Sequence, residues 1–218
     1  SDRATGAQVI GGSVGFTSES QTHLTRTPSS EGNRKTFTYS CWVKRDILAQ
    51  GLIGSVIMMH SNISSNSEIL SFDSSDRLHY YEVTSGSRKW NIITNRTFED
   101  TSKWYHIHVI RDTTDSTEGD RVRIYVDGTR ITSFNTETYP TLNQTGYWNQ
   151  TTYQHNVGSS GSASYIRGIG YLAEVNMVDG SNPDISTFGV TDTSTGRWIP
   201  KTLSGITYGT NGFRLKFQ

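Results

Sequence analysis

The segment from Tyr147 to His155 contains the residue types that proteins use to bind sugars without cutting them. It reads Tyr-Trp-Asn-Gln-Thr-Thr-Tyr-Gln-His. Aromatic rings stack on the apolar C–H faces of sugars, while amides fix the hydroxyl groups. The sequence therefore predicts a ligand-binding loop at 139–156, with the contacts Tyr147, Trp148, Asn149, Gln150, Tyr153 and His155. The alternative is that Trp148 and Tyr153 only anchor this loop to the body of the protein.

The loop 112–120 is a candidate calcium site. Asp112, Asp115, Glu118 and Asp120 place four carboxylates within nine residues, and calcium prefers such hard oxygen ligands. The spacing does not match an EF-hand loop, and acidic residues at a hairpin tip also serve solubility. Calcium is the one cofactor that the sequence suggests.

His106 and His108 are a weaker candidate for a metal site. Two residues apart on a strand, they would lie on one face about 7 Å from each other. A zinc site needs at least a third ligand, and the sequence does not identify one. We therefore expect both imidazoles to serve packing.

The residues around these histidines predict a β-hairpin with a visible register. Apolar side chains occupy every second position of 105–109 and again of 122–126. Asp127-Gly128 then supplies a tight turn, because glycine tolerates positive φ. Two strands that are apolar on one side and polar on the other indicate an antiparallel sheet with one buried face.

Strand patterns continue along most of the chain, with turn residues between them. They cover residues 13–17, 22–26, 36–44, 52–59, 67–72, 77–83, 88–93, 104–111, 121–127, 130–134, 163–166, 170–178, 196–199, 206–208 and 212–217. Only 97–103 and 183–188 could form a helical turn, and 135–162 has no clear pattern. Strands that follow one another without crossover helices predict an all-β fold, an antiparallel sandwich or barrel.

Composition narrows the class of protein. The formal net charge of +0 argues against a nucleic-acid partner, and no run approaches the ~20 apolar residues of a membrane span. Cys41 is the single cysteine, so no intrachain disulfide can form, and its alternating surroundings predict a core position. No linker divides the 218 residues, and the sequence does not open with a signal-peptide pattern. We therefore expect one domain, 1–218.

Four segments together resemble the concanavalin A-like, laminin-G-like jelly-roll superfamily. They are FTYSCWVKR at 37–45, WYHIHVIRD at 104–112, RVRIYVDGTRI at 121–131 and GYLAEVNMVDG at 170–180. The opening and the tail, FGVTDTSTGRWIPKTLSGITYGTNGFRLKF, look like domains in structural proteins of bacteriophages and other large viruses. The resemblance implies an antiparallel β-sandwich in which the last strand pairs near the strand at 13–17.

The resemblance also raises the question of catalysis, because laminarinase-type relatives carry Glu-x-Asp-x-x-Glu on one strand. Here the nearest match is Glu174-Val-Asn176-Met-Val-Asp179. Glycoside hydrolysis needs two carboxylates beside the scissile bond. An amide at 176 cannot take the electrostatic role of an aspartate, and Asp179 precedes a glycine in an expected turn. We therefore expect no enzymatic activity.

The resemblance implies a virion-surface module that binds rather than catalyses. One version is a tail-fibre or receptor-binding protein with lectin-like recognition of a host-surface glycan. The alternative is a capsid decoration or attachment protein whose partners are other virion proteins, and a glycoside hydrolase is the least favoured. A homo-oligomer, a trimer by analogy with fibres, is expected, with no nucleic acid and no membrane insertion.

Overall fold

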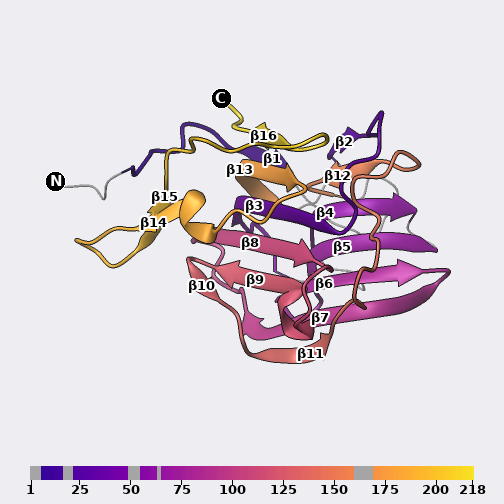
Figure 1. The fold of residues 1–218 in the computed structure, drawn as a ribbon. Coiled ribbons are helices and arrows are strands. Elements are labelled where there is room, and N and C mark those ends of the chain that lie inside the picture. Colours follow the sequence, from indigo (N-terminus) through magenta and orange to yellow (C-terminus); the bar gives the residue numbers. More distant parts are fainter. Residues whose placement is uncertain (1–5, 17–21, 49–54, 63–64, 160–168) are drawn as a thin grey trace.

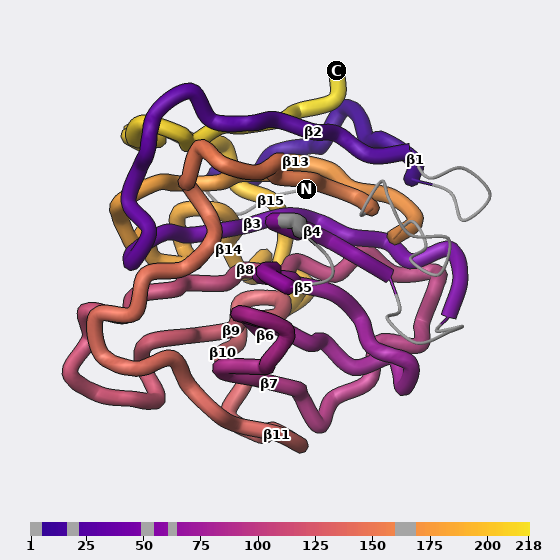
Figure 2. The backbone as a smooth tube through the Cα atoms, turned by 90° about the vertical axis from the view of Figure 1, so that its right-hand side faces the viewer, coloured from indigo at the N-terminus to yellow at the C-terminus, as the bar shows by residue number. Residues whose placement is uncertain are grey.

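A computed structural model of the chain describes residues 6–16, 22–48, 55–62, 65–159 and 169–218 (Figure 1). Within these ranges the protein forms two seven-stranded antiparallel sheets and a small two-stranded one. Figures 1 and 2 show the two large sheets as stacked layers, and one cluster of buried side chains from both fills the space between them. The predicted all-β antiparallel sandwich is confirmed.

The first sheet has the order β1-β13-β3-β8-β9-β10, with β16 also pairing with β13. Its strands are β1 (Val14–Phe16), β3 (Thr36–Lys44), β8 (Tyr105–Asp112), β9 (Val122–Val126), β10 (Thr129–Arg130), β13 (Gly170–Asp179) and β16 (Phe213–Leu215).

The second sheet has the order β11-β7-β6-β5-β4-β12-β2. Its strands are β2 (Leu24–Arg26), β4 (Ser55–Asn62), β5 (Asn66–Phe72), β6 (Arg77–Thr84), β7 (Ser87–Thr97), β11 (Phe134–Thr138) and β12 (His155–Val157). The small sheet is a hairpin of β14 (Gly189–Thr191) and β15 (Trp198–Pro200), and two 3-10 turns occur at η1 (Glu118–Asp120) and η2 (Ile185–Thr187).

The predicted hairpin and the predicted closure of the sheet are both present. Strands β8 and β9 pair in the expected antiparallel register, with Ile107 opposite Val126. Asp127 and Gly128 both have positive φ, 50° and 83°, as a two-residue turn matching the strand twist requires. Strands β1 and β16 pair with successive parts of β13, so the first and last strands lie along one edge.

Strand β3 shows how the alternating pattern builds the core. Phe37, Tyr39, Cys41 and Val43 point between the sheets and are fully buried. Cys41 therefore occupies the predicted core position. The residues between them, Thr38, Ser40 and Trp42, point to the outer face of the sheet.

The structure also corrects parts of the strand prediction. Strand β12 lies inside the stretch expected to have no strand, and its three residues are too few for a period to show. Residues 206–208 form no strand, and 97–103 form no helix. The turn expected at 183–188 contains η2. The strand predicted at 163–166 lies outside the described residues.

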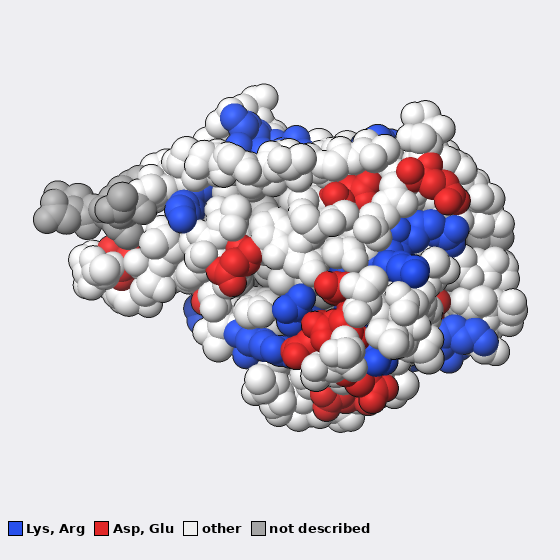
Figure 3. All heavy atoms as spheres, in the orientation of Figure 1, with Lys and Arg blue, Asp and Glu red and all other residues white. Residues whose placement is uncertain are grey.

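Charges of both signs are interspersed on the face seen in Figure 3, in keeping with the formal net charge of +0. A search of the described residues for a helix long and apolar enough to cross a membrane finds none.

Candidate functional site

The predicted sugar-binding loop is packed into the protein instead of facing outward. The Trp148 side chain is only 1% exposed, with its ring 4.7 Å from that of His155 and 6.3 Å from that of Phe37. Asn149 is also buried, and its amide donates to the backbone oxygen of Asn33 at 2.7 Å and to Asp179 at 3.0 Å. The anchoring alternative therefore describes how Trp148 is packed. Trp148, Asn149 and His155 also line a cavity of about 320 Å³ beside β2 and β16, so ligand binding by this loop stays a prediction.

The other predicted contacts gather around a buried histidine, His60. The Tyr147 ring stacks on it at 5.2 Å, and Tyr153 meets it edge-on at 5.5 Å. Gln150 lies within hydrogen-bond distance of its Nε2, at 2.8 Å. The six predicted residues therefore lie close together, and most of their contacts are with other side chains of the protein.

Two neighbouring histidines in this cluster stay neutral at pH 7. Burial lowers the pKa of His60 to about 3 and that of His155 to about 4. The Nε2 of His155 accepts a hydrogen bond from the backbone N–H of Asn149 at 2.9 Å. Burial therefore favours the neutral form of both imidazoles.

Residues 139–154, called the covering loop below, close over a buried ionic cluster. Glu68 on β5 lies directly opposite Glu82 on β6, and Arg111 on β8 of the other sheet reaches both, at 3.4 and 3.8 Å. The loop contributes the backbone N–H of Tyr147, 2.9 Å from Glu68, and the amide of Gln144, 2.8 Å from Glu82. The cluster thus links both sheets to the loop.

Further hydrogen bonds satisfy the two carboxylates. The Tyr80 hydroxyl donates to Glu68 at 2.5 Å, and the Trp90 indole donates to Glu82 at 3.2 Å. Two carboxylates nevertheless share a single guanidinium. Burial, and secondarily the charge of Glu68, raises the pKa of Glu82 to about 7.

The candidate calcium ligands are not brought together. Asp112 accepts hydrogen bonds from Thr36, Thr114 and Asn182. Elsewhere in the loop, the Asp115 carboxylate caps its own turn and Asp120 pairs with Arg130. Across the described ranges no group of three or more His, Cys, Asp or Glu side chains is placed to hold a metal ion. Asp112, Asp115 and Asp120 instead bond to their own turns and to neighbouring segments, so the geometry does not favour calcium there.

His106 and His108 pack against aromatic residues, as expected. The His106 ring lies 4.9 Å from Trp42 and 6.0 Å from Trp198, and its Nδ1 accepts from the Trp198 indole at 3.0 Å. Its Nε2 is 2.8 Å from the Ser40 hydroxyl. Burial lowers the pKa of both histidines.

The carboxylates of the hydrolase-like motif are engaged in structure. Glu174 sits in a β-bulge with φ 47°, and its carboxylate pairs with Arg214 at 2.8 and 3.1 Å. Asp179 accepts backbone N–H groups of Asn33 at 2.7 Å and Asn211 at 3.0 Å. The two side chains hold different segments in place and do not form a facing pair.

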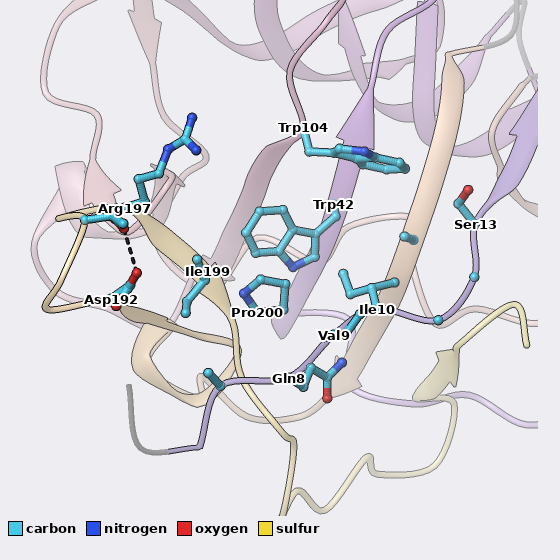
Figure 4. Close-up of a pocket in the computed structure, with 15 residues that line it drawn as sticks. Gln8, Val9, Ile10, Ser13, Trp42, Trp104, Asp192, Arg197, Ile199 and Pro200 are labelled. Atoms are coloured by element: carbon cyan, nitrogen blue, oxygen red, sulfur yellow. Dashed lines mark hydrogen bonds between the residues drawn. The ribbon is translucent and has the colours of Figure 1, made fainter. Parts of the chain in front are cut away.

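A cleft that the sequence reading missed lies on the outer face of the first sheet (Figure 4). Its volume is about 660 Å³, and it lies between the N-terminal segment 7–13 and the β14–β15 hairpin. Trp42 forms its floor and is 7% exposed, whereas Trp104, just before β8, is 38% exposed. The polar residues that line it are Gln8, Ser13, Asp192, Thr195 and Arg197.

Local sequence explains why the indoles face this cleft. Trp42 alternates with Cys41 and Val43, so it must point away from the core. Its partner across the strand pair is Ala173, whose small side chain leaves room above the sheet. The alternation that predicted the hairpin places Trp104 outside as well, and this was the signal available in the sequence.

Hydrogen bonds join the N-terminal wall of the cleft to the residues at the end of β15. The backbone N–H of Gln8 donates to the Pro200 oxygen at 3.0 Å, and Thr202 donates to Gly6 at 2.7 Å. On the other wall, Trp198 packs tightly on Gly128 and Gly189, where an added Cβ would come within 2.5 Å of the indole. These contacts make the cleft a built feature of the fold.

Comparison with known proteins identifies the family. Residues 18–181 match the family model of the concanavalin A-like lectin/glucanases superfamily. The chain belongs to this superfamily. Both walls of the cleft, residues 7–13 and 192–200, lie outside the matched stretch.

Solved structures show the same sandwich at low sequence identity. A heptameric SAP-like pentraxin from Limulus polyphemus is 13% identical with a TM-score of 0.52, over 78% of this chain and 77% of the pentraxin. The enzymatically active domain of tailspike protein 2 from bacteriophage CBA120 is 13% identical with a TM-score of 0.51, over 77% of this chain and 25% of that one. A search of curated proteins finds no match.

Replacing Trp148 should destabilise the protein. Trp148→Ala removes a buried indole, so we expect the free energy of unfolding to fall by about 3–5 kcal/mol in urea denaturation. Trp148→Phe keeps an aromatic ring in the core and should cost less. Equal stability of Trp148→Ala and wild type would contradict the anchoring role.

Replacing Glu82 should change how stability depends on pH. The pKa of Glu82 is raised from 4.5 to about 7 in the folded state, so the folded protein binds the carboxyl proton more tightly than the unfolded chain does. The protonated carboxyl therefore contributes stability below pH 4.5, and this contribution is lost as pH rises through 7. Relative to wild type, Glu82→Gln should therefore gain stability between pH 5 and pH 8, on the order of 2 kcal/mol.

The control for Glu82→Gln is Glu118→Gln, which removes an exposed carboxylate. Urea denaturation at pH 5 and pH 8 should show the same pH dependence for this control as for wild type. If Glu82→Gln also parallels wild type, the ionisation of Glu82 does not influence folding in this range.

Proposed function

We propose that this chain is a lectin-like, non-catalytic module that binds a glycan in the Trp42–Trp104 cleft. The observation that carries the proposal is the half-exposed Trp104 indole beside a second indole in a cleft of about 660 Å³. This volume is within the range of about 300–1,000 Å³ that small-molecule sites occupy. A ligand that covers the exposed part of the Trp104 indole would remove apolar surface from water, which favours binding.

The polar lining supports a sugar over a purely apolar ligand. Gln8 and Ser13 offer an amide and a hydroxyl from one wall, and Thr195 offers a hydroxyl from the other. A sugar ring presents an apolar face to an indole and hydroxyls at its edge. Figure 4 shows Gln8 and Ser13 on the N-terminal segment that runs past the two indoles.

The lining also supports binding without hydrolysis. Among the described residues that line the cleft, Asp192 is the one carboxylate, whereas glycosidases of the common types use two. Glu68 and Glu82 do face each other, but they are buried and ion-paired with Arg111.

For biological context we propose a virion-surface protein, of the tail-fibre or receptor-binding kind, that recognises a host-surface glycan. The resemblance of the opening and tail to phage and viral domains supports this, as does the shared fold of a bacteriophage tailspike domain. A homo-oligomer, such as a trimer, would strengthen a weak single site through avidity. Light scattering of the purified protein measures that state.

The alternative is a capsid decoration or attachment module that binds other virion proteins. Val9 is 67% exposed and Tyr171 is 41% exposed, and a protein partner could bury both together with Trp104. The two functions separate in one experiment. A lectin binds defined oligosaccharides on an array, whereas a decoration module binds none and captures virion proteins.

Trp104→Ala should lower the affinity for the bound oligosaccharide at least tenfold, which corresponds to about 1.4 kcal/mol, because it removes the stacking surface. Its thermal stability should stay close to wild type, since the residue is partly exposed. Leu142→Ala, another exposed apolar residue, is the matched control and should bind as wild type does. Unchanged affinity in Trp104→Ala would sink the proposed site.

A further inference from the structure

Two charged side chains, Asp192 and Arg197, line the cleft. Arg197 lines the cleft from the β14–β15 hairpin, and its guanidinium forms no ion pair within the described ranges of the chain. In Figure 4 Arg197 and Trp104 lie on opposite sides of the cleft, with Trp42 between them. A ligand stacked on Trp104 would therefore extend toward a positive charge.

A second cationic side chain, Lys44, lies on the same strand as Trp42. Lys44 follows Trp42 by two residues on β3, so both point to the outer face, about 7 Å apart along the strand. It lies opposite Tyr171 on β13, and Val43 beside it pairs with Tyr105, the neighbour of Trp104. Like Arg197, Lys44 forms no ion pair with any residue that the structure describes.

The nearby carboxylates are already engaged. Asp192 accepts hydrogen bonds from the Ser194 hydroxyl at 2.9 Å and the Thr195 hydroxyl at 2.7 Å. Glu174, below the N-terminal segment, is paired with Arg214 and also accepts from the Gln8 amide at 3.2 Å. These contacts occupy the carboxylate oxygens without cancelling the charge of Asp192, so the guanidinium of Arg197 is the charged donor in the lining that remains available to a ligand.

From this arrangement we propose that the cleft prefers an acidic glycan, one whose sugar carries a carboxylate or a sulfate within reach of Arg197. The planar guanidinium can form two parallel hydrogen bonds with either group, and Lys44 adds a positive charge on the same outer face of β3 as Trp42. The inference rests on the proposed function, since it names the class of glycan for the same cleft.

Matched oligosaccharides test this preference. Wild-type protein is titrated with one oligosaccharide in three forms, neutral, carboxylated and sulfated, by calorimetry at low and high salt. We expect an acidic form to bind at least tenfold more tightly than the neutral form, and added salt to reduce that ratio. The comparison of the two acidic forms shows which group the site reads.

Arg197→Gln should lower the acidic-to-neutral affinity ratio at least tenfold, and Arg197→Lys should restore part of it, because lysine keeps the charge but loses the planar fork. Arg88→Gln is the control for the loss of one positive charge, since Arg88 lies over Tyr81 on the second sheet. It should leave the ratio as in wild type. Thermal melting confirms that each variant is folded.

The outcomes separate this inference from the proposed function. The acidic preference would be overturned if wild-type protein bound the neutral and acidic forms with equal affinity. If that binding still depended on Trp104, the lectin function would stand. An acidic preference that survives in Arg197→Gln would also overturn the role of Arg197. Failure of all three forms to bind would overturn both proposals.

Discussion

The ionic cluster of Arg111, Glu68 and Glu82 is the constraint on which the arrangement of this sandwich depends. A buried carboxylate is tolerated only when it is paired and hydrogen-bonded, and these two meet that condition only if three parts of the chain come together. Arg111 comes from the first sheet, the glutamates come from the second, and the covering loop supplies Gln144 and the backbone of Tyr147. The cluster therefore fixes which end of the sandwich the loop closes, and the loop carries Trp148 into the core.

The sequence was sufficient for the fold because the deciding signals are local. Alternation along β3, β8 and β9 and the Asp127-Gly128 turn predicted the layers, the register and the buried position of Cys41. It was insufficient for the site because burial of the covering loop depends on residues distant in sequence, such as Phe37 and Glu68. Aromatic and amide composition suits a recognition surface and a packed anchor equally well. Trp42 and Trp104 stood on the outward side of the predicted alternation, but the walls that make them a cleft come from residues 7–13 and the β14–β15 hairpin.

The superfamily sandwich of this chain carries a cleft whose two walls lie outside its matched stretch. The residues of the hydrolase-like motif 174–179 make structural contacts. Glu174 is ion-paired with Arg214 on the last strand, and Asp179 accepts backbone N–H groups of Asn33 and Asn211. The cleft lies on the opposite side of the first sheet from the core, between segments outside residues 18–181. Fold alone would not have pointed to that face.

The burial of Cys41 has a practical consequence for labelling the protein. Its side chain is fully buried, and burial raises the pKa of its thiol well above the usual value, so in the folded protein it is both inaccessible and protonated. Thiol reagents attack the thiolate and should therefore pass it by. A cysteine introduced at an exposed position beside the cleft would then be the single reactive one. A fluorophore attached there could report ligand binding without removing the native residue.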